Sequence, residues 1–123
     1  MTPAAPDSRL QRALAQLAGY PAEALGAAES VWRTRDPGAS DRLLHAVLAH
    51  HLPPSPTRPA IGELPDTADL VQQVGLDSLA TVEMGFLLEG LFETKISDEE
   101  LRGLRTLGDL RAMVRAKVAA LPL

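Results

Sequence analysis

The 123-residue sequence has no cysteine and few aromatic residues, namely two Phe, one Tyr and one Trp. Without cysteine the chain has no disulfide, no thiolate metal site and no catalytic thiol, so any thiol chemistry must come from an added group. Strands favour aromatic and β-branched side chains, and these are scarce beside the abundant Ala and Leu. The composition therefore predicts an all-α protein with an aliphatic core.

The sequence also lacks the long apolar runs of membrane spans and signal peptides, and its middle part has few basic residues. No stretch is apolar over the length of a membrane span, and the Pro- and Ala-rich residues 1–7 do not lead into the apolar core of a signal peptide. Residues 63–100 contain ten acids against a single base, Lys95. We expect a cytoplasmic protein that binds neither membranes nor nucleic acid and that attracts basic partner surfaces.

The three histidines, His45, His50 and His51, have no cysteine or acidic cluster nearby at the spacing of metal ligands. They lie at the end of a predicted helix, where solvated or capping histidines are common. We therefore expect no metal site and no independent enzyme activity.

Proline and glycine at Asp36-Pro37-Gly38 divide the sequence into residues 1–38 and residues 39–123. The first part reads as one or two helices, over residues 8–18 and 21–33. This N-terminal helical extension is either a packing or flexible appendage or a docking element for a synthase or ligase. The sequence leaves both interpretations open.

The second part predicts four helices. Ser40 or Asp41 begins a helix that ends near His51, and a long connection follows over residues 52–77. Five apolar residues are expected to pin this connection to the core: Ile61, Leu64, Leu70, Val74 and Leu76. A helix over residues 78–92, a short helix from Asp98 and a last helix capped by Thr106, with its basic residues on the outer face, complete the pattern.

The segment Gly75-Leu76-Asp77-Ser78-Leu79 marks the start of the 78–92 helix. A serine at the first helical position lies beside free backbone N–H groups and the positive end of the helix dipole, which favour a phosphate group. Asp77 adds a carboxylate and serves as a helix cap. The segment therefore predicts Ser78 as a hydroxyl suited to carry a phosphodiester.

This segment, continued as Ala80-Thr81-Val82-Glu83-Met84, resembles the Asp-Ser-Leu motif of acyl carrier proteins. Over roughly residues 39–120 the resemblance implies an acyl-carrier-like four-helix bundle with a long first loop and a short third helix. It implies that Ser78 carries 4'-phosphopantetheine, taken from coenzyme A by a phosphopantetheinyl transferase, with Asp77 and Leu79 as flanking cofactor-binding residues. The chain would then hold acyl intermediates as thioesters and catalyse nothing itself.

The helix after Ser78 has two apolar stripes. One stripe is suited to the core: Thr81, Met84, Leu88, Leu91 and Phe92. The nearly opposite one, Leu79, Val82 and Phe86, is flanked by Glu83, Glu89 and Glu93 and resembles the recognition helix of carrier proteins. We expect Val82, Glu83, Phe86 and Glu89 to contact the transferase, acyl-loading enzymes and synthases. The alternative is that both stripes are buried, one of them beneath the extension.

Three positions of this helix depart from the pattern of fatty-acid carriers, which usually have acids where this chain has Ala80, Gly90 and Leu91. The departures favour a specialised carrier of fatty-acid or polyketide type, expected to be a monomer. Two alternatives stay open. One is an aminoacyl or peptidyl carrier of a nonribosomal pathway, although these more often have Gly-Gly-His/Asp-Ser before the helix. The other is an unmodified, carrier-like interaction subunit.

Overall fold

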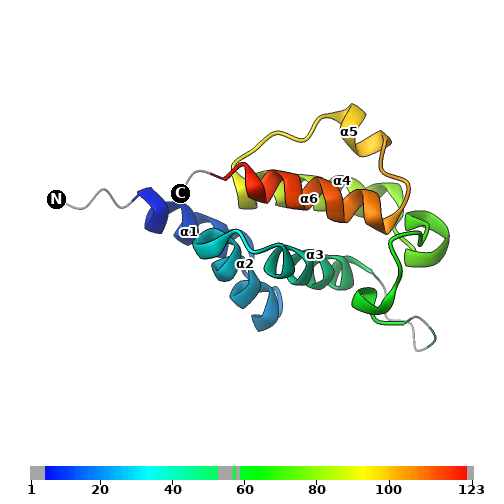
Figure 1. Ribbon diagram of the computed structural model, residues 1–123, viewed down its shortest axis with the longest axis horizontal. Coiled ribbons are helices and arrows are strands. Elements are labelled where there is room, and N and C mark those ends of the chain that lie inside the picture. The colour runs from blue at the N-terminus through cyan, green and yellow to red at the C-terminus, as the bar shows by residue number, and fades with distance from the viewer. Residues whose placement is uncertain (1–4, 53–56, 58, 122–123) are drawn as a thin grey trace.

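A computed structural model of the chain describes residues 5–52, 57 and 59–121. Its elements follow in this order: α1 (Ala5–Gln16), α2 (Ala22–Thr34), α3 (Pro37–His51), η1 (Ile61–Glu63), η2 (Leu70–Val74), α4 (Ser78–Phe92), α5 (Asp98–Arg102) and α6 (Leu107–Ala119) (Figure 1). Among the described residues there is no strand, only an isolated bridge between Asp69 and Thr106. The all-α prediction is confirmed, with its long connection before α4 and short helix α5.

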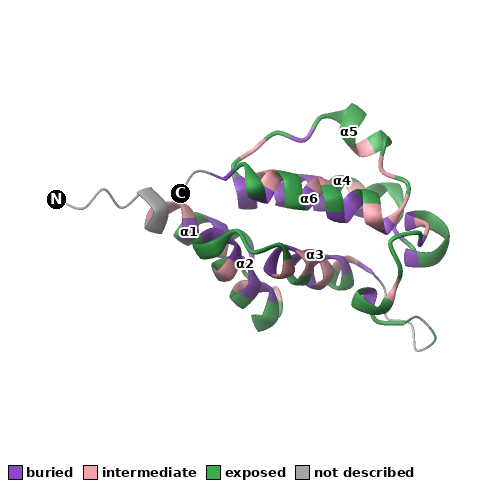
Figure 2. Ribbon diagram, in the orientation of Figure 1, coloured by how far each residue is buried: buried purple, intermediate pink, exposed green. Residues whose placement is uncertain are grey.

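The N-terminal helices α1 and α2 are packed onto the rest of the molecule. Among the described elements the most extensive helix pair is α2 with α3, and α1 also packs against α4. Leu17, Val31 and Trp32 of the extension are buried in the same hydrophobic core as α3, α4 and α6 (Figure 2). The extension is therefore a packed part of the molecule and not a flexible appendage. The domain boundary near Pro37 stays a prediction.

Helix α3 begins earlier than expected, and the predicted caps Ser40 and Asp41 are wrong. Its N-cap is Asp36, whose Oδ2 accepts a hydrogen bond from the Ala39 N–H at 3.2 Å, and Pro37 is the first helical residue. Proline has the right φ for this position and lacks an N–H that the first turn leaves unpaired in any case. The Pro-Gly pair that reads as a break therefore starts the helix.

The connection between α3 and α4 is held in place largely as predicted. Ile61, Leu70, Val74 and Leu76 are buried, and Leu64 is half-buried against the same core. Ile61 belongs to the single turn η1, and Leu70 and Val74 to η2. These short turns give the connection its own hydrogen-bonded backbone, which the apolar pattern alone does not reveal.

Arg111 departs from the expectation that the basic residues of the last helix lie on its outer face. Its side chain is buried, with 8% of the residue exposed. Nη1 donates to Asp66 Oδ1 at 2.7 Å, Nη2 donates to the carbonyl oxygens of Ile61 and Leu64, and Nε donates to His45 Nε2. Burial of the guanidinium is tolerated because these partners satisfy its donors, and it fastens the long connection to α6.

The last two helices begin at capping boxes. Ser97 caps α5 together with Glu100, and Thr106 caps α6 together with Asp109, which confirms the predicted cap at Thr106. None of the helices in the described ranges is both long and apolar enough to cross a membrane. The predicted cytoplasmic location stays a prediction.

Candidate functional site

Ser78 is the first residue of α4, and its side chain is exposed. Asp77 is the N-cap, and its Oδ1 accepts a hydrogen bond from the Ala80 N–H at 2.8 Å, so the predicted capping role is confirmed. Just before it, Gly75 has φ +90°, a left-handed conformation that glycine adopts without a steric penalty. The turn thereby brings Ser78 to the surface at the positive end of the helix dipole.

The backbone that leads to Ser78 is fixed by hydrogen bonds from several sides. Asp69 Oδ1 accepts from the N–H groups of Val71 and Gln72 at 2.9 and 2.7 Å, which caps η2. The Leu70 N–H donates to the Arg105 carbonyl at 3.0 Å, which joins η2 to the connection between α5 and α6. The position of the Ser78 hydroxyl is therefore set by the fold and not by a loose loop.

A cavity of about 360 Å³ opens beside Ser78, between η2, α4 and α5. Its wall is mostly aliphatic, with polar groups added by Asp77, Ser78, Thr81, Asp98 and Arg102. The aliphatic lining consists of Leu70, Val71, Leu76, Val82, Leu101 and Leu104. Such a space accepts an apolar chain next to the hydroxyl.

The two stripes of α4 are confirmed. Met84, Leu88, Leu91 and Phe92 are buried and Thr81 is half-buried. The opposite stripe is open to solvent, with exposed fractions of 67% for Leu79, 45% for Val82 and 69% for Phe86. The alternative in which the extension buries this second stripe is therefore wrong.

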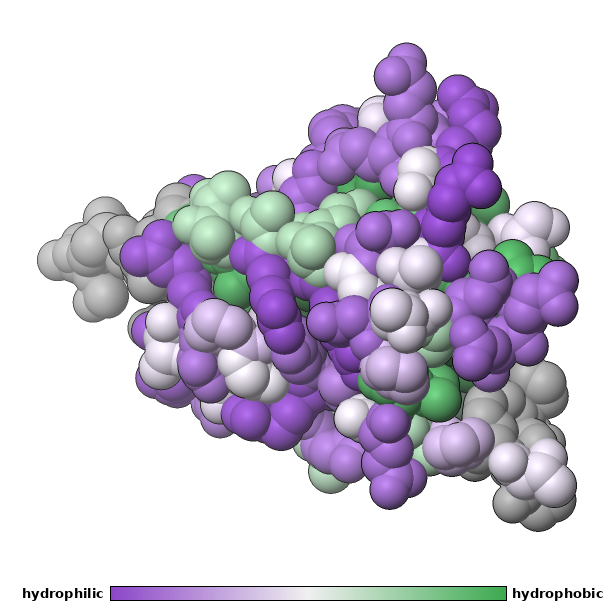
Figure 3. Space-filling model, turned by 45° about the vertical axis from the view of Figure 1, so that its right-hand side comes forward, coloured by the Kyte–Doolittle hydropathy of each residue, from purple (hydrophilic) through white to green (hydrophobic). Residues whose placement is uncertain are grey.

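Val71 of η2 is 67% exposed, and it lines the Ser78 cavity together with Val82. We call Val71, Leu79, Val82 and Phe86 the apolar patch. On the face of the molecule that Figure 3 presents, hydrophilic side chains predominate around a band and several smaller areas of apolar surface (Figure 3). Among the described residues the exposed large hydrophobic side chains are these four, and they lie on or beside one helix, which makes the patch a distinctive feature.

The acids expected to rim this stripe have partners within the chain. Glu89 Oε2 accepts a hydrogen bond from the Ile96 N–H at 2.8 Å, and Glu93 pairs with Arg12 at 3.1 Å. Glu83 keeps more freedom, since its side chain is 55% exposed and lies 4.0 Å from His51 Nδ1. Of the three acids, Glu83 is therefore the one most available to another protein.

His51 belongs to a small cluster beside Glu83. Its Nε2 is hydrogen-bonded to the Tyr20 hydroxyl at 2.8 Å, and His50 stacks on the Tyr20 ring with centroids 4.1 Å apart. Burial lowers the pKa of His51, opposed by the negative charge of Glu83, and burial raises the pKa of Tyr20. Two of the three histidines, His50 and His51, therefore have packing and hydrogen-bond roles that involve no bound ligand.

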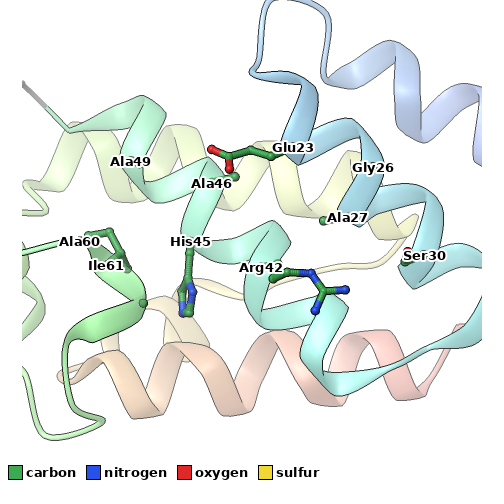
Figure 4. A pocket seen from close by; sticks show the side chains of 11 residues that line it. Glu23, Gly26, Ala27, Ser30, Arg42, His45, Ala46, Ala49, Ala60 and Ile61 are labelled. Atoms are coloured by element: carbon green, nitrogen blue, oxygen red, sulfur yellow. The ribbon is translucent and has the colours of Figure 1, made fainter.

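A second cavity, of about 580 Å³, lies between α2, α3 and η1 and shares no residue with the Ser78 cavity. Figure 4 shows Glu23, Arg42 and His45 around a lining of small residues such as Gly26 and Ala27 (Figure 4). Within the described residues, no group of three His, Cys, Asp or Glu side chains could hold a metal ion. Sequence reasoning missed this cavity because it depends on how α2 packs on α3.

Residues 59–114 match the family model for the phosphopantetheine attachment site. The chain is 38% identical over 56 residues to the acyl carrier protein of Prochlorococcus marinus, covering 46% of this chain and 70% of that protein. It is 38% identical over 53 residues to the meromycolate extension acyl carrier proteins of Mycobacterium tuberculosis and Mycolicibacterium aurum. These matches cover 43% of this chain and 46% and 55% of those proteins, about half their length. No solved structure matches the chain significantly.

Proposed function

Because the chain belongs to the acyl carrier protein family, whose members are carriers and not enzymes, we propose that Ser78 is the residue to which its 4'-phosphopantetheine arm is attached. The observation that carries the proposal is the placement of Ser78. Its exposed hydroxyl is at the start of α4, beside the capping carboxylate of Asp77 and within the matched residues 59–114. The surroundings fit a phosphodiester, because the helix dipole favours its negative charge there.

In this proposal the chain itself presents the 4'-phosphopantetheine arm, and the reactive groups belong to the arm and to the partner enzymes. The arm supplies a terminal thiol that holds acyl groups as thioesters. In the reaction run by a phosphopantetheinyl transferase, Ser78 Oγ would lose its proton and bond to the phosphorus next to the pantetheine of coenzyme A, while the pyrophosphate bond breaks and adenosine 3',5'-bisphosphate leaves. Asp77 and Leu79 flank that oxygen. The hydrogen-bonded turn from Gly75 to Asp77 places the attachment point, and an arm attached there would reach several active sites at high local concentration.

We propose an acyl cargo of fatty-acid or polyketide type. The cavity beside Ser78 is mostly aliphatic, which suits an apolar chain better than a charged aminoacyl group. Two of the relatives are named as meromycolate extension acyl carrier proteins, which supports a lipid pathway. We also propose that the protein works in the cytoplasm as a monomer, the state that leaves the Ser78 face free.

We propose that partner enzymes dock on the first half of α4. The support is the apolar patch beside Ser78, to which Val82 and Phe86 contribute, and the accessible carboxylate of Glu83. The transferase has to reach the Ser78 hydroxyl, and the acyl-loading enzymes and synthases have to receive the arm attached at the same place. A shared contact surface next to Ser78 meets that requirement.

Intact-mass spectrometry tests the attachment site. We expect the chain, incubated with coenzyme A and a broad-specificity transferase, to gain the mass of one phosphopantetheine arm, and Ser78→Ala to gain none while keeping its melting temperature. Ser97→Ala is the matched control, because Ser97 is also an exposed serine at a helix start. A wild-type protein that gains no mass would contradict the proposal and favour the unmodified interaction subunit. Loading of Ser78→Ala would place the arm on another residue.

A further inference from the structure

We propose that helices α1 and α2 restrict partner docking to the first half of α4, residues 78–86, by covering its C-terminal end. The partners that fit present an apolar contact surface near Ser78, with at most one cation placed for Glu83. Partners that depend on a row of cations along the whole helix are disfavoured. This inference rests on the proposed carrier function and adds to it which kind of enzyme surface the carrier accepts.

The carboxylates at the end of α4 already have partners within the chain. Arg12 Nη2 lies 3.1 and 3.2 Å from the two carboxylate oxygens of Glu93, and Arg9 Nε lies 4.0 Å from Oε2. Glu89 accepts its hydrogen bond from the Ile96 N–H. A cation on a partner would have to displace Arg12 to pair with Glu93, and one oxygen of Glu89 is held by a backbone amide, so this end offers less electrostatic attraction than two free carboxylates would.

The surface at the end of α4 is also occupied sterically. A Cβ atom built on Gly90 would lie 3.0 Å from Gln16 Oε1 and 3.1 Å from Gln16 Cδ, so the α1 side chain lies directly on the helix backbone. Trp32 of α2 is buried and donates from Nε1 to the Leu91 carbonyl at 3.1 Å. In Figure 1, α1 lies toward the end of α4 and away from its start. A partner cannot contact the helix at Gly90 and Leu91 without moving the extension.

The extension reaches as far as the middle of α4, where the open region begins. Tyr20, in the connection between α1 and α2, is hydrogen-bonded to His51, and His51 lies 4.0 Å from Glu83. Glu83 is nevertheless mostly exposed, and Leu79 and Phe86 are free of the extension. The surface left for a partner is therefore the apolar patch with a single carboxylate, and its complement is an apolar depression with one basic group.

Loading kinetics with coenzyme A and a broad-specificity transferase as the probe separate the two halves of α4. We expect Phe86→Asp to lower kcat/KM by about tenfold or more, because a charge replaces a central apolar contact. Glu93→Gln and Arg12→Gln should stay within about twofold of wild type, because exposed pairs contribute little to stability and these lie outside the contact. Melting temperatures establish that each variant is folded. A fivefold or larger loss in folded Glu93→Gln would overturn the inference.

A nuclear magnetic resonance footprint provides the second measurement. We expect the transferase with coenzyme A, titrated into ¹⁵N-labelled Ser78→Ala protein, to broaden amide signals of residues 71 and 78–86 and to leave those of 9–16 and 89–93 unchanged. Broadening at residues 9–16 or 89–93 would overturn the restriction while leaving the carrier function intact. A wild-type chain that accepts no arm would instead overturn the carrier function, and this inference with it.

Discussion

The two ends of α4 belong to the same helix and have opposite surroundings. At its start Ser78 is exposed, and Leu79 and Phe86 project into solvent. At its end Phe92 is buried, and Glu93 is paired with Arg12 of α1. The difference shows that the surroundings of the helix change along its length: its start is open to solvent, where we propose that the arm is attached and partners dock, and its end anchors the extension to the core.

Two aromatic residues, Trp32 at the covered end and Phe86 in the open half, give the largest expected difference. We expect Trp32→Ala to lower the free energy of unfolding by about 3 to 5 kcal/mol, because a buried indole is lost and a cavity remains. Phe86→Ala should change it by no more than about 0.5 kcal/mol, because its side chain is already exposed. Urea denaturation, followed by circular dichroism, measures both.

Trp32→Phe is the control for the hydrogen bond to the Leu91 carbonyl. It keeps most of the packing and removes the Nε1 donor, so we expect a loss of about 1 kcal/mol, below that of Trp32→Ala. Equal stabilities of Trp32→Ala and Phe86→Ala would break the comparison, since the covered end would then contribute no more to the fold than the open one.

Substitutions of Asp77 test how the open end of α4 contributes to stability and to loading. Asp77→Ala should destabilise the protein by about 1 kcal/mol, because the Ala80 N–H loses its acceptor at the start of α4. Asp77→Asn keeps an acceptor and should cost less. We propose that the carboxylate also helps the transferase organise the Ser78 hydroxyl, and we therefore expect Asp77→Asn to be loaded more slowly than wild type at a nearly unchanged melting temperature. Equal loading rates would reduce Asp77 to a structural cap.

Features determined by local sequence could be predicted. The start of α4, the start of α5 at Asp98 and the Thr106 cap all follow from side chains that hydrogen-bond within a few residues of their own position. The exposed stripe with Val82 and Phe86 follows from helical periodicity. Ser78 stood out because its motif and the helix start coincide.

Features that depend on contacts between distant segments could not be predicted. Arg111 reads as an outer-face base, and only the fold brings Asp66 and two loop carbonyls to its guanidinium. The sequence has one indirect sign that α1 covers the end of α4. This is Gly90, whose missing side chain makes room for Gln16. From the sequence alone that glycine indicates close packing or a bend, without naming the partner.

The smallest effect is expected at the boundary between the two halves, where His51 lies among Tyr20, His50 and Glu83. Burial lowers the pKa of His51 below its usual value of 6.5, so the unfolded chain binds the proton more readily. Its contribution to stability is therefore complete above about pH 6.5 and is lost as the pH falls through the lower, folded pKa.

His51→Gln should accordingly flatten the fall in melting temperature between about pH 7.5 and 5 without abolishing it. A residual slope is expected because burial and the Arg111 charge lower the pKa of His45 in the same direction. Melting curves of wild type and His51→Gln at matched pH give the difference between the two slopes. A steeper fall in the variant would mean that Glu83 stabilises protonated His51, and at low pH this carboxylate would then be paired within the chain and less available to a partner.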